Sequence, residues 1–199
     1  MSIKNIIFPL LLATVVGLSG CSKNQDDIDL PVFDALGGDF TLPSTLGSPL
    51  TLSDYKGRVV LINFGYSSCP DICPMVLGHL SKVSKQLKDA HSIDAKQLQV
   101  IFITVDPERD AIDKLVKYLA FFDGDFVGVR GTIEQTSELA KKYAVFFEKQ
   151  AEENMNYQVA HTDKIFLLDK RGRLRGLYSS GDQKEKLIKD IVSLAEAEI

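Results

Sequence analysis

A nearly unbroken apolar run followed by a cysteine pair constrains the fold of this chain more than any other feature. The run, residues 59–64, reads Val-Val-Leu-Ile-Asn-Phe and is typical of a parallel strand that is buried on both faces. Beyond the cysteines, apolar residues recur at steps of four, three and four, which places them on one face of a helix: Val76, Leu80, Val83 and Leu87. The sequence therefore predicts a strand that leads through Cys69 and Cys73 into a helix.

The same order of strand and helix repeats further along the chain. Residues 98–105 predict a second buried strand, with Asp106 as the N-cap and Pro107 as the first residue of a helix that runs to about Phe122. The later patterns predict a strand over 126–129, a helix over 132–146, two strands over 164–169 and 174–178 with a turn between them, and an amphipathic helix over 183–197. Two strand-helix units thus lead into a terminal hairpin and helix.

Two further segments complete the predicted fold. Short apolar pieces between Phe33 and Leu52 alternate with glycines and predict a β-hairpin at the entrance to the domain. Residues 148–158 are rich in acidic and amide side chains, fit no core face, and predict an exposed excursion. The whole pattern predicts an α/β, thioredoxin-like fold with an N-terminal β-hairpin and a loop or hairpin insertion before the penultimate strand.

The N-terminus has the layout of an export signal. Lys4 is the one charge in residues 1–20, and the apolar run 6–18 is short for a membrane-spanning helix, so residues 1–20 are interpreted as a signal peptide that is cleaved. The sequence Leu-Ser-Gly-Cys that ends at Cys21 resembles a bacterial lipobox, which implies that Cys21 is lipidated and begins the mature chain. The polar residues that follow have too little apolar surface to pack and predict a tether.

Charge and cysteine usage narrow the possible partners. The chain carries 23 basic and 27 acidic side chains, intermixed and without a basic stripe, which argues against nucleic acid as a partner. With Cys21 assigned to lipid, Cys69 and Cys73 remain as a close pair in an oxidising compartment. Such a pair is a structural disulfide, a redox-active one, or a soft-metal site that another system keeps reduced.

Prolines beside the cysteines indicate where the helix begins. Because proline is tolerated in the first helical turn but not deeper, Pro74 is predicted at the first helical position, with Cys73 as the cap and Cys69 in the preceding turn. The positive end of the helix favours thiolate over thiol at this pair. In a regular helix the two Cβ atoms would lie about 5–6 Å apart, too far for a disulfide, but a non-helical turn can close the gap, so dithiol and disulfide both remain open.

The spacing of the cysteines favours metal over simple thiol exchange. Three residues separate them, where thioredoxin-like reductases ordinarily have two. Thiolates select Cu(I), and an imidazole completes a three-coordinate set suited to either Cu(I) or Cu(II). Zinc usually takes a fourth protein ligand, which is not evident in this sequence. Met155 is a further soft donor, but an exposed loop methionine ordinarily binds nothing.

The three histidines differ in how well their positions along the chain suit the role of the imidazole ligand. His79 lies beside the apolar stripe of the first helix and His91 at its polar end, as is typical of surface or flank residues. His161 shortly precedes the strand 164–169, where a thioredoxin-like fold brings a loop against the cysteine turn. The predicted metal ligands are therefore Cys69, Cys73 and His161.

Three motifs, in order along the chain, resemble the signatures of the Sco/SenC family: Phe64-Gly-Tyr-Ser-Ser-Cys-Pro-Asp-Ile-Cys-Pro74, Val105-Asp-Pro-Glu-Arg-Asp110 and Ala160-His-Thr162. The resemblance covers roughly residues 33–178. Many members carry an acidic residue just before the histidine, where this chain has Ala160, and that departure affects a contact to the histidine rather than the ligand itself. Asp106 is expected to act as a helix N-cap, with support of the metal site as the alternative role.

The resemblance implies a copper chaperone for the dinuclear copper centre of cytochrome c oxidase. Its partners would be the copper-site subunit of the oxidase and periplasmic thiol reductants or copper donors. It would sit on the periplasmic side of the bacterial membrane, held by the lipid, with the inner membrane favoured over the outer. The expected domains are a signal peptide over 1–20, a lipidated N-terminus and tether over 21–31, and a thioredoxin-like copper-binding domain over 32–199.

Two enzyme hypotheses compete with copper transfer. In the first, Cys69 and Cys73 are the redox-active pair of an extracytoplasmic thiol-disulfide reductase that acts on cysteines of the oxidase copper site. His161 discriminates between the two readings, because thiol exchange needs a thiolate but no third ligand. The second is a thiol peroxidase, since peroxiredoxins share the fold and the pattern at 52–57, but residues 64–68 lack the proline and threonine that precede the reactive cysteine in such enzymes.

Overall fold

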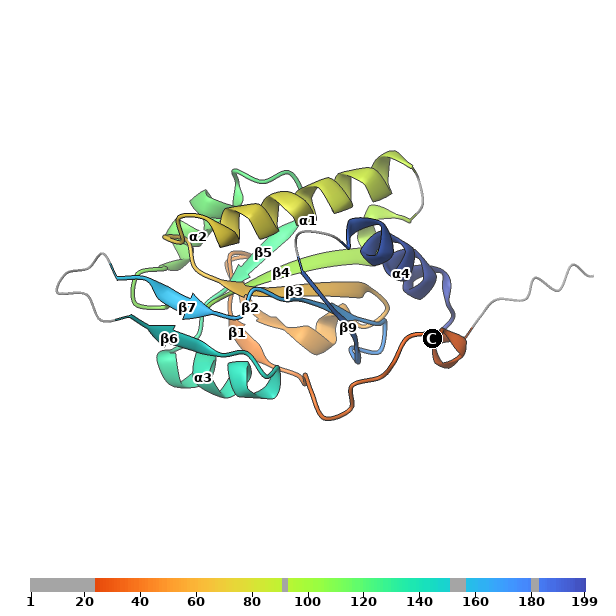
Figure 1. The fold of residues 1–199 in the computed structure, drawn as a ribbon, viewed down its shortest axis with the longest axis horizontal. Helices are drawn as coiled ribbons and strands as arrows, with labels where there is room; N and C mark the ends of the chain where they lie inside the picture. The colour runs from red at the N-terminus through yellow and green to blue at the C-terminus, as the bar shows by residue number, and fades with distance from the viewer. Residues whose placement is uncertain (1–23, 91–92, 151–156, 180–182) are drawn as a thin grey trace, which may run out of the picture.

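A five-stranded mixed sheet forms the centre of the structure, with its strands in the order β5-β4-β3-β8-β9 (Figure 1). The computed structural model describes residues 24–90, 93–150, 157–179 and 183–199. The predicted signal peptide, Cys21, His91 and Met155 lie outside the described residues. The strands are β3 (Val59–Gly65), β4 (Leu98–Thr104), β5 (Phe126–Val129), β8 (Ile165–Leu168) and β9 (Leu174–Tyr178).

The two central strands are buried along their whole length. Strands β3, β4 and β5 run parallel, whereas β8 is antiparallel to both β3 and β9. Every residue of β3 and β4 is buried, because helices and loops cover both faces of the sheet. Side chains from alternate positions of these strands therefore enter two separate cores.

Three helices cover one face of the sheet, and a fourth helix with a small hairpin covers the other (Figure 1). The first face carries α1 (Ile72–Asp89), α2 (Ile112–Leu119) and α4 (Lys184–Glu196). The second carries α3 (Ile133–Lys142) and the hairpin of β1 (Thr41–Pro43) and β2 (Pro49–Thr51). Short 3₁₀ helices span Gln25–Asp27, Leu52–Tyr55 and Ala95–Gln97. None of the helices within the described ranges combines the length and apolar character needed to cross a membrane.

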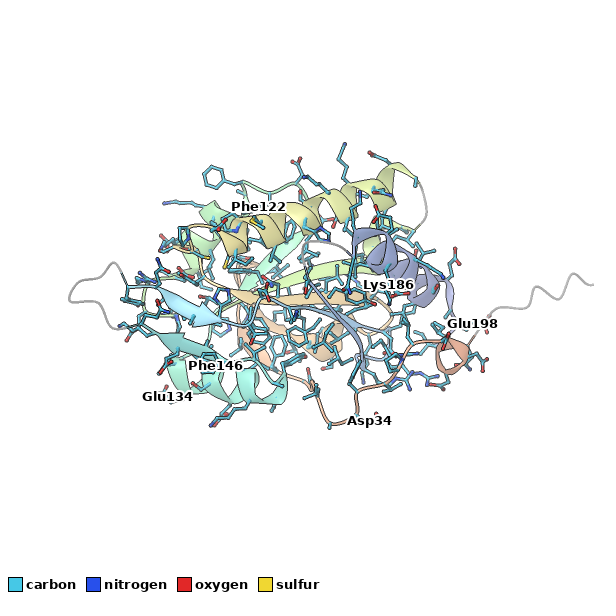
Figure 2. All side chains as sticks on the ribbon, in the orientation of Figure 1. Asp34, Phe122, Glu134, Phe146, Lys186 and Glu198 are labelled. Atoms are coloured by element: carbon cyan, nitrogen blue, oxygen red, sulfur yellow. The ribbon has the colours of Figure 1, made fainter. Side chains whose placement is uncertain are left out.

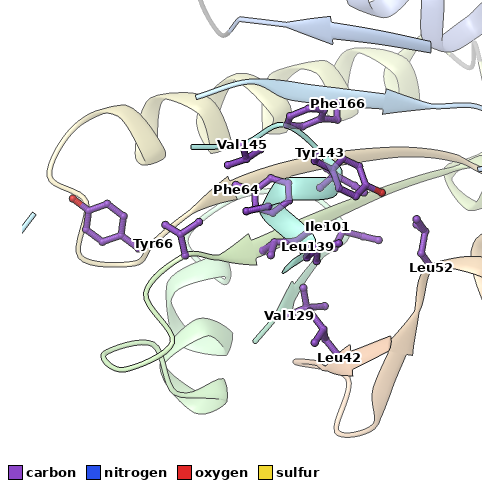
Figure 3. Close-up of a cluster of buried hydrophobic side chains, with 14 of the residues drawn as sticks. Leu42, Leu52, Phe64, Tyr66, Ile101, Val129, Leu139, Tyr143, Val145 and Phe166 are labelled. Atoms are coloured by element: carbon purple, nitrogen blue, oxygen red, sulfur yellow. The ribbon is translucent and has the colours of Figure 1, made fainter. Parts of the chain in front are cut away.

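Buried aromatic rings organise the core beneath α3. Phe64, Tyr143 and Phe166 pack pairwise in tilted or edge-to-face arrangements, with ring centroids 5.5 to 5.9 Å apart. Figure 3 shows Tyr66 at one edge of this cluster, its ring set apart from the other aromatic rings. This edge is where the chain leaves β3 and approaches the cysteines.

The predicted strands, the N-terminal hairpin and the insertion are confirmed. The insertion is itself a hairpin, of β6 (Phe147–Lys149) and β7 (Val159–His161), and it forms a separate two-stranded sheet. The expectation that residues 148–158 fit no core face is wrong at Tyr157, which is only 4 % exposed. The predicted helix over 132–146 ends at Lys142, because Ala144 takes a left-handed conformation (φ 52°) that turns the chain into β6.

The predicted start of the helix at Asp106 is also wrong. Helix α2 begins at Ile112, and Ala111 rather than Asp106 occupies the N-cap. The Asp106 carboxylate turns inward to bind Arg109 and Tyr157, while its backbone carbonyl accepts N–H bonds from Arg109 and Asp110 and closes a turn. Asp106 therefore builds a loop between β4 and α2.

The predicted tether is, from Asn24 onward, folded onto the domain. Asp26 pairs with Arg171 and Arg173, each at 2.8 Å. Arg175, 1 % exposed, pairs with buried Asp169 at 3.0 Å and donates hydrogen bonds to the carbonyl oxygens of three residues of the segment: Ile28, Leu30 and Pro31. The polar composition was misleading because the segment binds largely through backbone carbonyls and the Asp26 carboxylate, with the side chains of Ile28 and Leu30 packed against the core.

We predict that Arg175→Met lowers the free energy of unfolding by about 3 kcal/mol, because it removes the cation of a buried ion pair and the donors to three carbonyl groups. Chemical denaturation monitored by circular dichroism measures the change. The control is Arg58→Met at an exposed arginine, expected to change stability by less than about 0.5 kcal/mol. Equal effects of the two substitutions would show that the contacts of Arg175 contribute nothing to stability.

Candidate metal and thiol site

The cysteines lie where β3 leaves the sheet and α1 begins. Asp71 is the N-cap and Ile72 the first helical residue, so Cys73 is the second and Pro74 the third. The prediction that Cys73 caps the helix and Pro74 opens it is therefore wrong by two residues. Proline is still tolerated at the third position, because the first four N–H groups of a helix have no partner within it. Cys69 lies in the preceding turn, as predicted, and its sulfur accepts one of those N–H groups, that of Cys73, at 3.4 Å.

Gly65 leaves the space that the Cys73 sulfur occupies. A Cβ atom at this position would lie 2.8 Å from Cys73 Sγ and 2.8 Å from the ring of Phe102. Gly65 is the last residue of β3 and is not among the residues with positive φ, so its role here is to give room rather than to permit a special backbone conformation. Cys73 is consequently packed against the end of the sheet and is 1 % exposed.

The two thiols differ in acidity. The hydrogen bond from the Cys73 thiol, helped by the N–H groups of Asp71 and Cys73 and by the charge of His161, lowers the pKa of Cys69 to about 5 against the opposing effect of burial. The pKa of Cys73 is raised, first by its hydrogen bond to Cys69 and then by burial. At neutral pH the site therefore holds one thiolate, Cys69, beside one thiol. The expectation that the helix end favours thiolate applies to Cys69 alone.

His161 is brought to the cysteines by the inserted hairpin. It ends β7, and its Nε2 lies 3.4 Å from Cys73 Sγ. Its Nδ1 lies 3.0 Å from the carbonyl oxygen of Val159, which can only accept, so Nδ1 donates this hydrogen bond and Nε2 is the ring nitrogen that faces the sulfur. The ring packs edge-on against Tyr66, with centroids 5.5 Å apart. The predicted approach of His161 to the cysteine turn is thus seen in the structure.

His79, which the sequence places beside the apolar stripe of the first helix rather than among the ligands, is not part of this group. His79 lies further along α1, where burial lowers its pKa and its Nε2 has no hydrogen-bond partner within the described ranges. Among the described residues, no three His, Cys, Asp or Glu side chains already converge as ligands of one metal ion. Cys69, Cys73 and His161 are therefore adjacent donors, and binding an ion would require them to close around it.

Several residues that support the site were not predicted from the sequence. Asp110 is fully buried and accepts hydrogen bonds from Ser67 and Thr104. Tyr157 donates to Asp106 at 2.8 Å, and the Tyr66 hydroxyl accepts the N–H of Val159 at 3.3 Å. A tyrosine within an otherwise polar segment was the available signal for Tyr157, and the second aspartate of the 105–110 motif was the signal for Asp110.

Chemically, the site can do two things. A thiolate, a neighbouring thiol and an imidazole form a donor set that suits a soft metal ion, and Cu(I) above all. An acidic thiol beside a buried one is also the arrangement in which a thiolate attacks a disulfide and a second thiol resolves the product. Cys69 and Cys73 are not joined by a disulfide in this structure.

Known proteins share both the sequence and the fold. One relative is a protein named SCO2, mitochondrial, from Saccharomyces cerevisiae, to which the chain is 38 % identical over 141 residues. The matched region covers 70 % of this chain and 46 % of the relative. It thus spans about half the length of that relative. The structure of Bradyrhizobium japonicum ScoI with copper bound is 33 % identical, with a TM-score of 0.71 over 80 % of this chain and 99 % of that one. Yeast Sco1 with copper bound is 30 % identical, with a TM-score of 0.73 over 83 % and 91 %.

These similarities confirm the predicted fold and identify the family. The α/β arrangement is that of the thioredoxin-like Sco structures. The SCO1/SenC family matches residues 29–196, which is nearly all of the described chain. The chain therefore belongs to the SCO1/SenC family.

Proposed function

We propose that this protein binds copper through Cys69, Cys73 and His161 and passes it to the copper-site subunit of cytochrome c oxidase. The observation that carries the proposal is the 3.4 Å contact of His161 Nε2 with Cys73 Sγ. Thiol exchange has no need of an imidazole in that place, whereas a soft-metal site does. The similarity to ScoI and Sco1, whose structures contain copper, supports the same reading.

The donor set suits copper in either oxidation state. Cys69 is already a thiolate at neutral pH, and Cys73 would give up its proton on binding, as thiol ligands do. The hydrogen bond from Nδ1 to the Val159 carbonyl holds the imidazole in the form that can coordinate through Nε2. Copper would be the cargo of the protein, so the ligands must both capture and release it.

The low pKa of Cys69 favours a second candidate function, reduction of a disulfide in the same recipient. In that reaction the Cys69 thiolate attacks the recipient disulfide, one recipient thiolate leaves, and Cys73 then displaces the other to give the Cys69–Cys73 disulfide. The protein is oxidised and the recipient is reduced, so periplasmic thiol reductants would have to restore the dithiol. Both candidate functions use the same cysteines, and only copper transfer uses His161 as a ligand.

We also propose that Cys21 carries a lipid and holds the domain on the periplasmic side of the inner membrane. The sequence that ends at Cys21 resembles a lipobox, and acyl chains would supply the apolar area that the polar N-terminal segment lacks.

For the anchor, Cys21→Ala is expected to move the protein from the membrane fraction to the soluble fraction. Fractionation of cells that express the full chain, with mass spectrometry of the N-terminal peptide, measures both location and acylation. A substituted protein that is still processed and still sediments with membranes would contradict the proposed lipid anchor.

The reactivity of Cys69 should follow the pKa of about 5. In the reduced protein, alkylation of Cys69 by iodoacetamide is expected to rise as pH increases through about 5 and to be near its plateau at about pH 7, because the thiolate is the nucleophile. Cys73, whose pKa is raised, should stay unmodified over the same range. Timed alkylation followed by peptide mass spectrometry measures the two rates. A shared midpoint near about pH 8.5, the value of an ordinary thiol, would contradict the asymmetry.

For copper, His161→Ala should weaken binding by more than about 100-fold while the Cys69–Cys73 disulfide still forms and is reduced at near-normal rates. Competition with a copper chelator gives the affinity, and thiol titration at several pH values gives the exchange rates. His79→Ala, in α1 outside the site, is the matched control and should leave copper affinity unchanged. Restoration of oxidase assembly by a His161→Ala protein that cannot bind copper would replace copper transfer with disulfide reduction as the function.

A further inference from the structure

The loop between β4 and α2 buries two carboxylates that the copper ligands do not account for. Asp106 is 3 % exposed and Asp110 is 0 % exposed. A buried carboxylate is costly unless cations and hydrogen-bond donors surround it, so the partners of each one are informative. The two carboxylates are bound to two different parts of the site.

Asp106 holds the hairpin that carries His161. Its Oδ1 accepts the hydroxyl hydrogen of Tyr157 at 2.8 Å, and its Oδ2 pairs with Arg109. The Arg109 guanidinium lies over the Tyr157 ring, 3.6 Å from the centroid, and the Lys149 ammonium lies 3.8 Å from the same centroid. Tyr157, just before strand β7 of the hairpin, is thus held through its hydroxyl and through its ring.

The contact continues from Tyr157 to the imidazole through Tyr66. Arg109 lies 5.6 Å from the centroid of the Tyr66 ring, and this ring packs edge-on against His161. The Tyr66 hydroxyl also accepts the N–H of Val159, two residues before His161. Because β6 and β7, in the part of the chain that the structure describes, form a sheet separate from the central one, the position of His161 depends on such side-chain contacts.

Asp110 holds the segment that carries Cys69. It accepts hydrogen bonds from the backbone N–H of Ser67 at 2.9 Å and from the Ser67 hydroxyl. Lys114 bridges Asp110 and the Ser68 hydroxyl, at 3.3 and 3.0 Å. The residues just before Cys69 are therefore bound to the same loop, but to a different carboxylate.

We propose that residues 106–110 form a bracket with two separable arms, in which Asp106, Arg109 and Tyr157 position His161 while Asp110 positions the Cys69 turn. Tyr157 is a positioning residue, since it touches none of the three donors in the described contacts. The expected effect on copper binding rests on the proposed copper ligands, but the bracket itself can be tested in the metal-free protein.

The first arm is tested by Tyr157→Phe, with Tyr178→Phe as the matched control. Tyr178 is also buried and also donates to a buried aspartate, Asp190, which is likewise paired with a cation, Lys186. Asp190 and Lys186 belong to α4, and Figure 2 shows Lys186 far from the β6–β7 hairpin. In the reduced, metal-free protein, Tyr157→Phe should speed hydrogen exchange at the amides of Val159 and Thr162 by about tenfold, and Tyr178→Phe should not. Tyr157→Phe should also weaken Cu(I) binding by about five- to tenfold, with the Cys69–Cys73 disulfide equilibrium unchanged within about twofold.

The second arm is tested by Ser67→Ala, with Ser44→Ala as its control. Ser44 is buried and donates to the carbonyl of Ser48 in the distant β1–β2 hairpin region. Ser67→Ala should change the alkylation rate of Cys69 by about twofold or more and leave exchange at Val159 unchanged, which is the reverse of the Tyr157→Phe pattern.

The outcomes separate the bracket from the proposed function. Unchanged exchange in Tyr157→Phe, or equal loss of copper affinity in Tyr178→Phe, would overturn the first arm. A Ser67→Ala protein that matches Tyr157→Phe in every assay would overturn the separation of the arms. If His161→Ala binds copper normally, the proposed ligand set fails, and the exchange measurements still decide whether the bracket exists.

Discussion

The close approach of the Cys73 sulfur to Gly65 fixes how the first helix meets the sheet. Because residue 65 has no side chain, the first turn of α1 can rest directly on the end of β3, with Phe102 of β4 beside it. Two contacts of the site are made by Cys73 in that position: the Cys69 sulfur accepts the N–H of Cys73, and His161 Nε2 lies against the Cys73 sulfur. A larger residue at position 65 would displace the Cys73 sulfur and so disturb both contacts.

This placement also explains why two chemically identical thiols behave differently. Cys73 is enclosed by the sheet and acts as a hydrogen-bond donor, whereas Cys69 lies in the turn before the helix and receives the N–H groups of the first turn. The more acidic thiol is therefore that of the slightly more exposed cysteine, Cys69, and the more deeply buried Cys73 faces the imidazole. The same asymmetry suits capture of a soft ion, since only one proton has to leave when both sulfurs coordinate.

The sequence was sufficient to predict the strands and helix faces that depend on local periodicity. The buried strands at 59–65 and 98–104 and the apolar face of α1 follow from residues close together in the chain, and so does the approximate place of the cysteines. His161 required the fold as well, because its contact with Cys73 joins residues 88 apart. The failures at Asp106, at Tyr157 and at the N-terminal segment have one cause: each polar group bonds to a distant partner, and local rules assign it a cap, a loop or a tether. Arg175 itself, a charged residue in an otherwise apolar strand, was the feature of the sequence that could have indicated a buried ion pair.

The N-terminal segment and the sulfurs are attached at opposite ends of the same strand. Arg175 and Asp169, which hold residues 28–31, lie near the Val59 end of β3, since Val60 pairs with Leu168, whereas the cysteines follow Gly65. Seven residues of strand separate the two ends by about 20 Å. If the chain is anchored through its N-terminus, as proposed for Cys21, the anchor and the cysteines would therefore act at opposite ends of the domain, about 20 Å apart.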